Sequence, residues 1–185
     1  MSMQHKAFLF DIGSFESELA PVLMNALLHH DPAALVAFIE AHRDVVVDPY
    51  EGEPLENDWL VSLQRQRAND ATTLGDEACR LMLIQDVADH ALTKYYNVKD
   101  DEGLGNWLNL SERLSEPQRA ALLGIPFGPA ANPFDPGRMG SYFQDWLTVQ
   151  QSQSALRDCL LPELRSFLAL LAKATAEHKG VYVTF

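Results

Sequence analysis

Apolar residues recur along this chain at intervals of three and four, the spacing that places them on one face of an α-helix. The longest such stretch is Leu74–Tyr96, where apolar positions cover more than one face of the expected helix. A helix with so wide an apolar surface is usually packed among other helices. The pattern therefore predicts a central buried helix over Leu74–Tyr96.

Similar periodicity predicts further helices on both sides of this one. Ser17 is expected to cap the first of them, and Asn69-Asp70 to break the helix that precedes the central one. Pro162 should kink or restart the last helix, because proline removes a backbone N–H. The expected helices cover about residues 17–28, 32–42, 56–68, 116–123 and 139–151, and a final stretch from 152 or 154 to 178.

Three short runs rich in β-prone residues are the strand candidates: Ala7–Ile12, Val45–Val47 and Val181–Phe185. Ala7–Ile12 could also lead into a helix. An unpaired strand at a chain end invites association with other chains, so we expect the last run to pair with Ala7–Phe10 or Val45–Val47. The sequence thus predicts a mainly α, α+β single domain over residues 1–185. It would have six to eight helices around the central one and a small two- or three-stranded sheet that includes the C-terminal strand.

Length and composition are compatible with this picture. A chain of 185 residues with 47% hydrophobic residues can bury a core of its own. Cys79 and Cys159 lie far apart in apolar surroundings, which is typical of reduced thiols in a cytoplasmic protein. No apolar run has the length of a membrane span, and the first residues do not resemble a signal peptide. We therefore expect a cytoplasmic location and no membrane association, and we make no prediction about oligomeric state.

The charge balance is strongly acidic, with 14 Lys and Arg against 26 Asp and Glu and a formal net charge of −12. Such a chain repels phosphate backbones, so we expect no nucleic-acid partner. Between Asp44 and Asp58 there are acids but no Lys or Arg, and prolines and a glycine predict a loop there. A solvated loop is the simpler interpretation, and a docking surface for a basic protein is the alternative. The residues expected to bind such a partner are Asp48, Glu51, Glu53, Glu56 and Asp58.

A polar stripe interrupts the central helix. Asp86, Asp89, His90 and Thr93 follow the spacing that places side chains on one helix face. A histidine and two carboxylates there could bind a divalent metal or act as an acid–base pair. The simpler interpretation is that the stripe faces solvent or pairs with Arg or Lys from a neighbouring helix. The residues that could complete a metal site are His29, His30, His42 and Glu40. Because no complete motif connects them, we expect neither a metal nor a cofactor.

Pro126–Gly140 is the longest stretch without periodicity, and Arg138 is its only basic residue. Long loops are either functional or held down by their own side chains. Arg138 could clamp a carboxylate or phosphate with its planar guanidinium, or it could tie the loop to backbone carbonyls. We favour the second role, in which Arg138 binds backbone carbonyls of the loop, and we keep it as a weak catalytic candidate.

The segment around Asp11 (AFLFDIGSF) superficially resembles the first motif of haloacid-dehalogenase-type phosphatases, in which an apolar strand ends in a nucleophilic Asp. Those phosphatases usually carry a second Asp two positions later, where this chain has Gly13. The alternation of strands and helices that their fold requires is also missing downstream. The sequence therefore does not favour that activity.

Two functional hypotheses follow. The first is a non-enzymatic interaction or regulatory protein, of inhibitor or immunity type, whose acidic surface docks a basic partner. The alternative is a metal-dependent hydrolase or small-ligand-binding enzyme that uses Asp86, Asp89 and His90 together with Arg138. The net charge and the lack of a catalytic motif favour the first.

Overall fold

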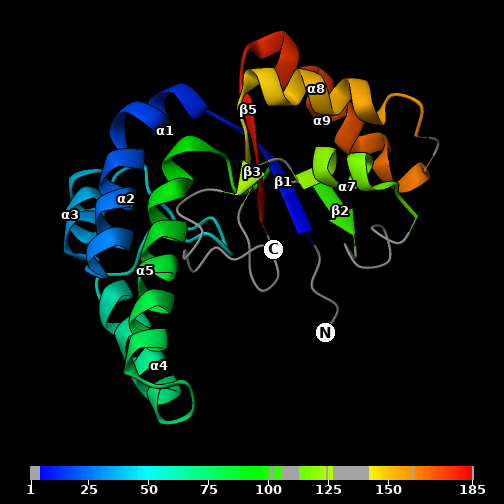
Figure 1. Ribbon diagram of the computed structural model, residues 1–185. Helices are drawn as coiled ribbons and strands as arrows, with labels where there is room; N and C mark the ends of the chain where they lie inside the picture. The colour runs from blue at the N-terminus through cyan, green and yellow to red at the C-terminus, as the bar shows by residue number, and fades with distance from the viewer. Residues whose placement is uncertain are drawn as a thin grey trace. The chain divides into compact units, whose positions relative to one another are not determined.

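The computed structural model of the chain describes residues 5–100, 102–105, 113–123, 125–126, 142–159 and 161–184. These residues group into two compact units by their contacts. Unit 1 comprises the described residues up to Ile12 and those from Lys99 onward, and unit 2 comprises Gly13–Val98. The strands labelled in Figure 1 all belong to unit 1. A single domain over residues 1–185 stays a prediction.

Unit 1 is built on a small antiparallel sheet. Its strands are β1 His5–Phe10, β2 Glu102–Gly105, β3 Ile125–Pro126, β4 Tyr142–Gln144 and β5 Gly180–Thr184. Among the described residues the sheet has five strands, in the order β2-β1-β5-β4-β3. The C-terminal strand β5 lies at its centre and pairs with β1, from Lys6 opposite Thr184 to Phe10 opposite Gly180. The last strand of the chain is therefore protected on both sides.

Alternation along the strands gives this sheet two different faces. On one face, Ala7, Val181 and Val183 are buried in a core with apolar side chains from the helices α8 (Trp146–Leu156) and α9 (Arg165–Glu177). On the other face, Tyr182 stacks on Phe143, with ring centroids 5.1 Å apart. Unit 1 also contains α7 (Glu116–Leu123) and the short 3-10 helix η2 (Pro162–Leu164).

Unit 2 consists of helices that pack around one central helix. They are α1 Ile12–Glu18, whose first residue lies in unit 1, then α2 Ala20–His29, α3 Ala33–Ala41, α4 Trp59–Leu74, α5 Asp76–Leu92 and the 3-10 helix η1 Thr93–Tyr95. Helix α5 packs against α4, α3 and α2, and its C-terminal half is the most deeply buried part. In Figure 1, α4 and α5 run side by side as a long pair.

The predicted fold class is confirmed: the described residues contain eight α-helices and a small antiparallel sheet that includes the C-terminal strand. The sheet has five strands where two or three were expected, because the very short β3 and β4 extend it. The C-terminal strand pairs with the N-terminal run and not with Val45–Val47, where only an isolated bridge joins Val47 to Pro54. Within the part of the chain that the structure describes, no helix is both long and apolar enough to cross a membrane.

Three local expectations were wrong. Ser17 is no helix cap, because it lies inside α1 and its hydroxyl donates to the carbonyls of Gly13 and Ser14. Helix α4 continues through Asn69-Asp70 and ends before Gly75, whose φ of 83° breaks the helix. The helix expected over residues 139–151 begins only at Trp146, because the preceding residues join the sheet as β4. Pro162 does restart the last helix, as expected.

The close approach of β5 and β4 predicts a cost for any side chain at Gly180. A Cβ atom there would lie 2.5 Å from the carbonyl oxygen of Gln144 and 3.0 Å from Cβ of Ile12. We expect Gly180→Ala to lower the free energy of unfolding by about 2 kcal/mol or more, as measured by urea denaturation. The control is Ser166→Ala, an exposed position on α9, which should change it by less than about 0.5 kcal/mol. Equal stabilities of the two variants would contradict this close packing.

Candidate functional site

The segment Asp48–Asp58, which we call the acidic loop, is folded back on itself in unit 2. Oδ1 of Asp48 accepts hydrogen bonds from the backbone N–H groups of Tyr50 and Glu51, each at 2.8 Å. The backbone N–H of Asp48 donates to the carbonyl of Glu53 at 2.8 Å. Aspartate favours such turns because its short side chain satisfies nearby N–H groups. The loop therefore has a defined shape, set mainly by its first residue.

Two side chains tie the acidic loop to the helices of unit 2. The guanidinium of Arg43 donates to the carbonyl of Glu56 at 2.7 Å and pairs with the carboxylate of Glu40 at 3.0 Å. At the other end of the loop, the hydroxyl of Thr93 accepts from the N–H of Val47 at 3.0 Å and lies 2.7 Å from the carbonyl of His90. Thr93, one of the four stripe residues, is thus an anchor for the loop.

Asp86 is held in an ion pair between α4 and α5. Both of its carboxylate oxygens accept from the guanidinium of Arg67, at 2.6 and 2.8 Å, and the same guanidinium donates to Asp70 at 2.9 Å. The side chains of Arg67 and Asp86 are only 15% and 13% exposed. This is the pairing with a neighbouring helix that the simpler interpretation of the stripe expected, so Asp86 acts first as a structural link.

Asp89 has no such partner. Its Oδ1 is buried and accepts no hydrogen bond from the described residues. Burial, and to a lesser extent the negative charge of Asp86, raises the pKa of Asp89 to about 8. Both effects disfavour the ionised carboxylate. Asp89 is therefore largely protonated at neutral pH.

His90 is buried among residues of three segments, with 5% of its surface exposed. Its Nδ1 lies 2.7 Å from the carbonyl oxygen of Asp86, one turn earlier in α5. Its ring lies against the indole of Trp59 with centroids 5.3 Å apart, and its Nε2 is 3.9 Å from Oδ2 of Asp48. Trp59 in turn donates its indole N–H to Glu40 at 3.1 Å. The stripe is thus connected to the acidic loop through His90.

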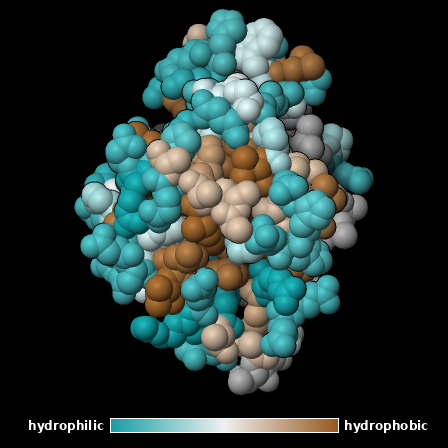
Figure 2. Space-filling view, turned by 90° about the vertical axis from the view of Figure 1, so that its left-hand side faces the viewer, coloured by the Kyte–Doolittle hydropathy of each residue, from teal (hydrophilic) through white to brown (hydrophobic). Residues whose placement is uncertain are grey.

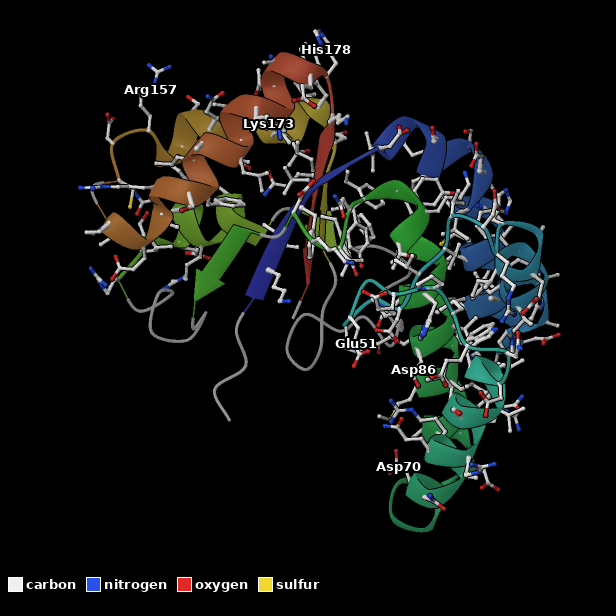
Figure 3. All side chains as sticks on the ribbon, turned by 180° about the vertical axis from the view of Figure 1, so that it is seen from behind. Glu51, Asp70, Asp86, Arg157, Lys173 and His178 are labelled. Carbon is white, nitrogen blue, oxygen red and sulfur yellow. The ribbon has the colours of Figure 1, made fainter. Side chains whose placement is uncertain are left out.

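A pocket of about 350 Å³ lies where the acidic loop meets α4 and α5. The loop from Asp48 to Glu56 forms one wall, and Trp59, Gln66 and His90 contribute to the others. The pocket brings together two features that the sequence marked separately, the acid-only loop and the stripe. Figure 3 shows Glu51 on this loop, with Asp86 and Asp70 further along the α4–α5 pair.

Not every residue marked in the sequence reaches this pocket. Asp58, Asp86 and Asp89 do not line it, and Arg138 lies outside the described residues. Among the described residues no three His, Cys, Asp or Glu side chains are grouped so that they could hold a metal ion. The ring of His42, a possible metal ligand in the sequence, lies against that of Phe38 with centroids 4.3 Å apart and the planes tilted by 32°.

Two residues of the site were not predicted from the sequence: Arg43, which holds the acidic loop, and Trp59, which lines the pocket. Trp59 is buried, with 6% of its surface exposed, and also lines the pocket. Nothing in the local sequence of Arg43 points to the loop, because the carbonyls that it binds lie twelve and thirteen residues later. Arg67 could have been connected to Asp70 from their helical spacing, but its bond to Asp86 required the packing of α4 on α5.

A scan against protein-family models, a search of curated proteins and a search of solved structures found no match to this chain.

The burial of Asp89 predicts a specific pH dependence of stability. The folded protein retains a proton on Asp89 up to about pH 8, whereas the unfolded chain loses it near the ordinary value of 3.8. Its contribution to stability is therefore fully present below pH 4 and declines as the pH rises towards 8. We expect Asp89→Asn to raise the free energy of unfolding at pH 8 by at least about 2 kcal/mol, and to flatten its pH profile between 4 and 8.

The measurement is urea denaturation across this pH range. Asp44→Asn, which removes a carboxylate from an exposed position, is the matched control and should leave the shape of the profile unchanged. A profile of Asp89→Asn that runs parallel to that of the parent protein would exclude a buried, protonated Asp89.

The bonds of Thr93 predict that its hydroxyl keeps the acidic loop in place. Thr93→Val preserves the shape of the side chain but leaves the N–H of Val47 without its partner. We expect a loss of about 1–2 kcal/mol in the free energy of unfolding and faster hydrogen exchange at residues 47–56. Thr93→Ser retains the hydroxyl and should exchange like the parent. Equal exchange rates in the Val and Ser variants would show that this hydroxyl does not anchor the loop.

Proposed function

We propose that this protein is a non-enzymatic interaction protein, of regulatory, inhibitor or immunity type, and that its acidic loop docks a basic partner protein. The observation that carries the proposal is the lining of the pocket. Its described lining residues include four carboxylates, Asp48, Glu51, Glu53 and Glu56, and no Lys or Arg. A concave surface with one sign of charge attracts ligands of the opposite charge and accelerates their association.

The surroundings of the acidic side chains support the same proposal. Tyr50 is 73% exposed at the tip of the loop, and Val45, just before the loop, is 48% exposed. Tyrosine is enriched in protein interfaces, because it offers a large contact area together with a polar group. The face shown in Figure 2 is mostly hydrophilic, with hydrophobic side chains gathered between the hydrophilic ones. Next to the charges of the acidic loop, apolar contact area is available at Tyr50 and Val45.

The fixed shape of the loop lowers the entropic cost of docking. Asp48, Arg43 and Thr93 already hold its backbone, so less conformational freedom is lost when a partner binds. Charges that are held in place also discriminate between partners better than charges on a mobile segment. This organisation supports a recognition surface over a merely solvated loop.

The alternative, an enzyme that uses the stripe, has less support. The carboxylate of Asp86 is already bound by the guanidinium of Arg67, and Asp89 does not line the pocket. Of the three stripe residues named as catalytic candidates, His90 lines this pocket and Asp86 and Asp89 do not. A single imidazole without a positioned second group is a weak basis for acid–base catalysis.

Charge reversal on the loop tests the docking function. The partner is recovered by affinity capture at low ionic strength, purified and titrated against the parent protein and a triple variant, Glu51→Lys, Glu53→Lys and Glu56→Lys. We expect the triple variant to bind at least about tenfold more weakly, and the affinity of the parent to fall with added salt.

The matched control carries the same change in net charge at exposed acids outside the loop, Glu16→Lys, Asp158→Lys and Glu177→Lys. It should lose less than about threefold in affinity. If both triple variants lose affinity equally, net charge governs binding and the acidic loop is not the docking surface.

A further inference from the structure

The imidazole of His90 has one satisfied and one unsatisfied nitrogen. Nδ1 lies 2.7 Å from the carbonyl oxygen of Asp86, and a carbonyl can only accept, so Nδ1 must carry the proton of the neutral ring. Nε2 is then a hydrogen-bond acceptor. Oδ2 of Asp48, which is also an acceptor, lies 3.9 Å from Nε2. In the neutral ring, two hydrogen-bond acceptors therefore face each other.

This arrangement lies at the wall of the pocket. His90 is nine-tenths buried and lines the pocket together with Asp48, whose Oδ2 lies 3.9 Å from its Nε2. The lining also contains the carboxylates of Glu51, Glu53 and Glu56, which only accept, and the side chains of Tyr50, Ser62 and Gln66, which can donate as well as accept. With four carboxylates and no Lys or Arg among the described lining residues, the pocket is complementary to a ligand that brings N–H donors and positive charge.

The geometry favours an organic cation over a metal ion. Within the described residues no group of three or more potential ligands is arranged to coordinate a metal. A guanidinium, in contrast, carries five N–H donors in one plane and can serve two acceptors at once. It also stacks on aromatic rings, and Trp59 lines this pocket beside His90. At about 350 Å³ the pocket falls at the lower end of the range for small-ligand sites.

We propose that this pocket binds the guanidinium group of an arginine side chain supplied by the basic partner, with N–H groups donated to Nε2 of His90 and to the carboxylate of Asp48, and with Trp59 against its face. The inference rests on the proposed docking function and adds the chemistry of the anchoring residue. The remaining carboxylates of the acidic loop attract the partner, and the pocket recognises one side chain.

The test uses the full chain and small probes. N-acetyl-arginine methylamide is titrated while the ring nitrogens of His90 are followed by ¹⁵N NMR. The lysine and citrulline counterparts are titrated in parallel. We expect a saturable shift of the Nε2 resonance with the arginine probe. The affinity should be at least about tenfold higher than for citrulline, which is neutral, and higher than for lysine, which offers no planar pair of donors.

Asp48→Asn is the informative variant. Its Oδ1 can still accept from the N–H groups of Tyr50 and Glu51, so the turn is preserved. The side-chain amide of this variant can donate an N–H to Nε2, where the parent has a carboxylate oxygen that only accepts. The substitution also removes the negative charge. We expect binding of the arginine probe to weaken at least about tenfold, whereas Asp44→Asn, which removes an exposed carboxylate outside both the acidic loop and the pocket, should change it less than about threefold.

Two results would overturn the inference: an Nε2 resonance that does not move at saturating arginine probe, or equal affinities for the lysine and arginine probes. Either result leaves the docking function intact if charge reversal on the loop still abolishes partner binding. An arginine probe that shifts Nε2 and is sensitive to Asp48→Asn supports the pocket, even if the loop variants bind the partner normally.

Discussion

Burial of the C-terminal half of α5 is the constraint on which the organisation of unit 2 depends. Ile84, Val87 and Ala91 are fully buried and hold this helix against its neighbours. Because the same turns carry the polar stripe, packing the apolar faces also brings polar side chains out of water. Each of them must then find a partner or bear a desolvation cost. The candidate site is a consequence of how those polar groups are satisfied.

The stripe residues satisfy this requirement in different ways. Asp86 is neutralised by Arg67 from α4, and Thr93 bonds the backbone at the start of the acidic loop. Asp89 keeps a proton, and His90 bonds a carbonyl with one nitrogen while the other lines the pocket. Of these four side chains, only that of His90 lines the pocket between the acidic loop, α4 and α5.

Much of the fold was predictable because local periodicity reports which faces are apolar. The central helix and the restart at Pro162 follow from patterns within short segments. The sequence left two partners open for the last strand, Ala7–Phe10 and Val45–Val47, and only the structure decided for the first. The expectation that failed most clearly was the helix over residues 139–151. Tyr142 and Phe143 suit a helix or a strand equally well, and their pairing with Val183 and Tyr182, some forty residues away, decided for the strand. Likewise, Asp70 does not end α4, because Arg67 one turn earlier satisfies its carboxylate.

The sequence by itself determined the two features that make up the candidate site. They are a loop that contains acids but no Lys or Arg, and a polar stripe whose residues share one helix face. Helical geometry and turn chemistry act over a few residues, so both features can be read locally. Only the tertiary structure decided that the loop folds over His90, that Arg67 binds Asp86 and that Oδ1 of Asp89 is buried. Those outcomes depend on contacts between residues far apart in the chain, such as Val47 with Thr93. No local pattern specifies such contacts, because they follow from the packing of whole helices.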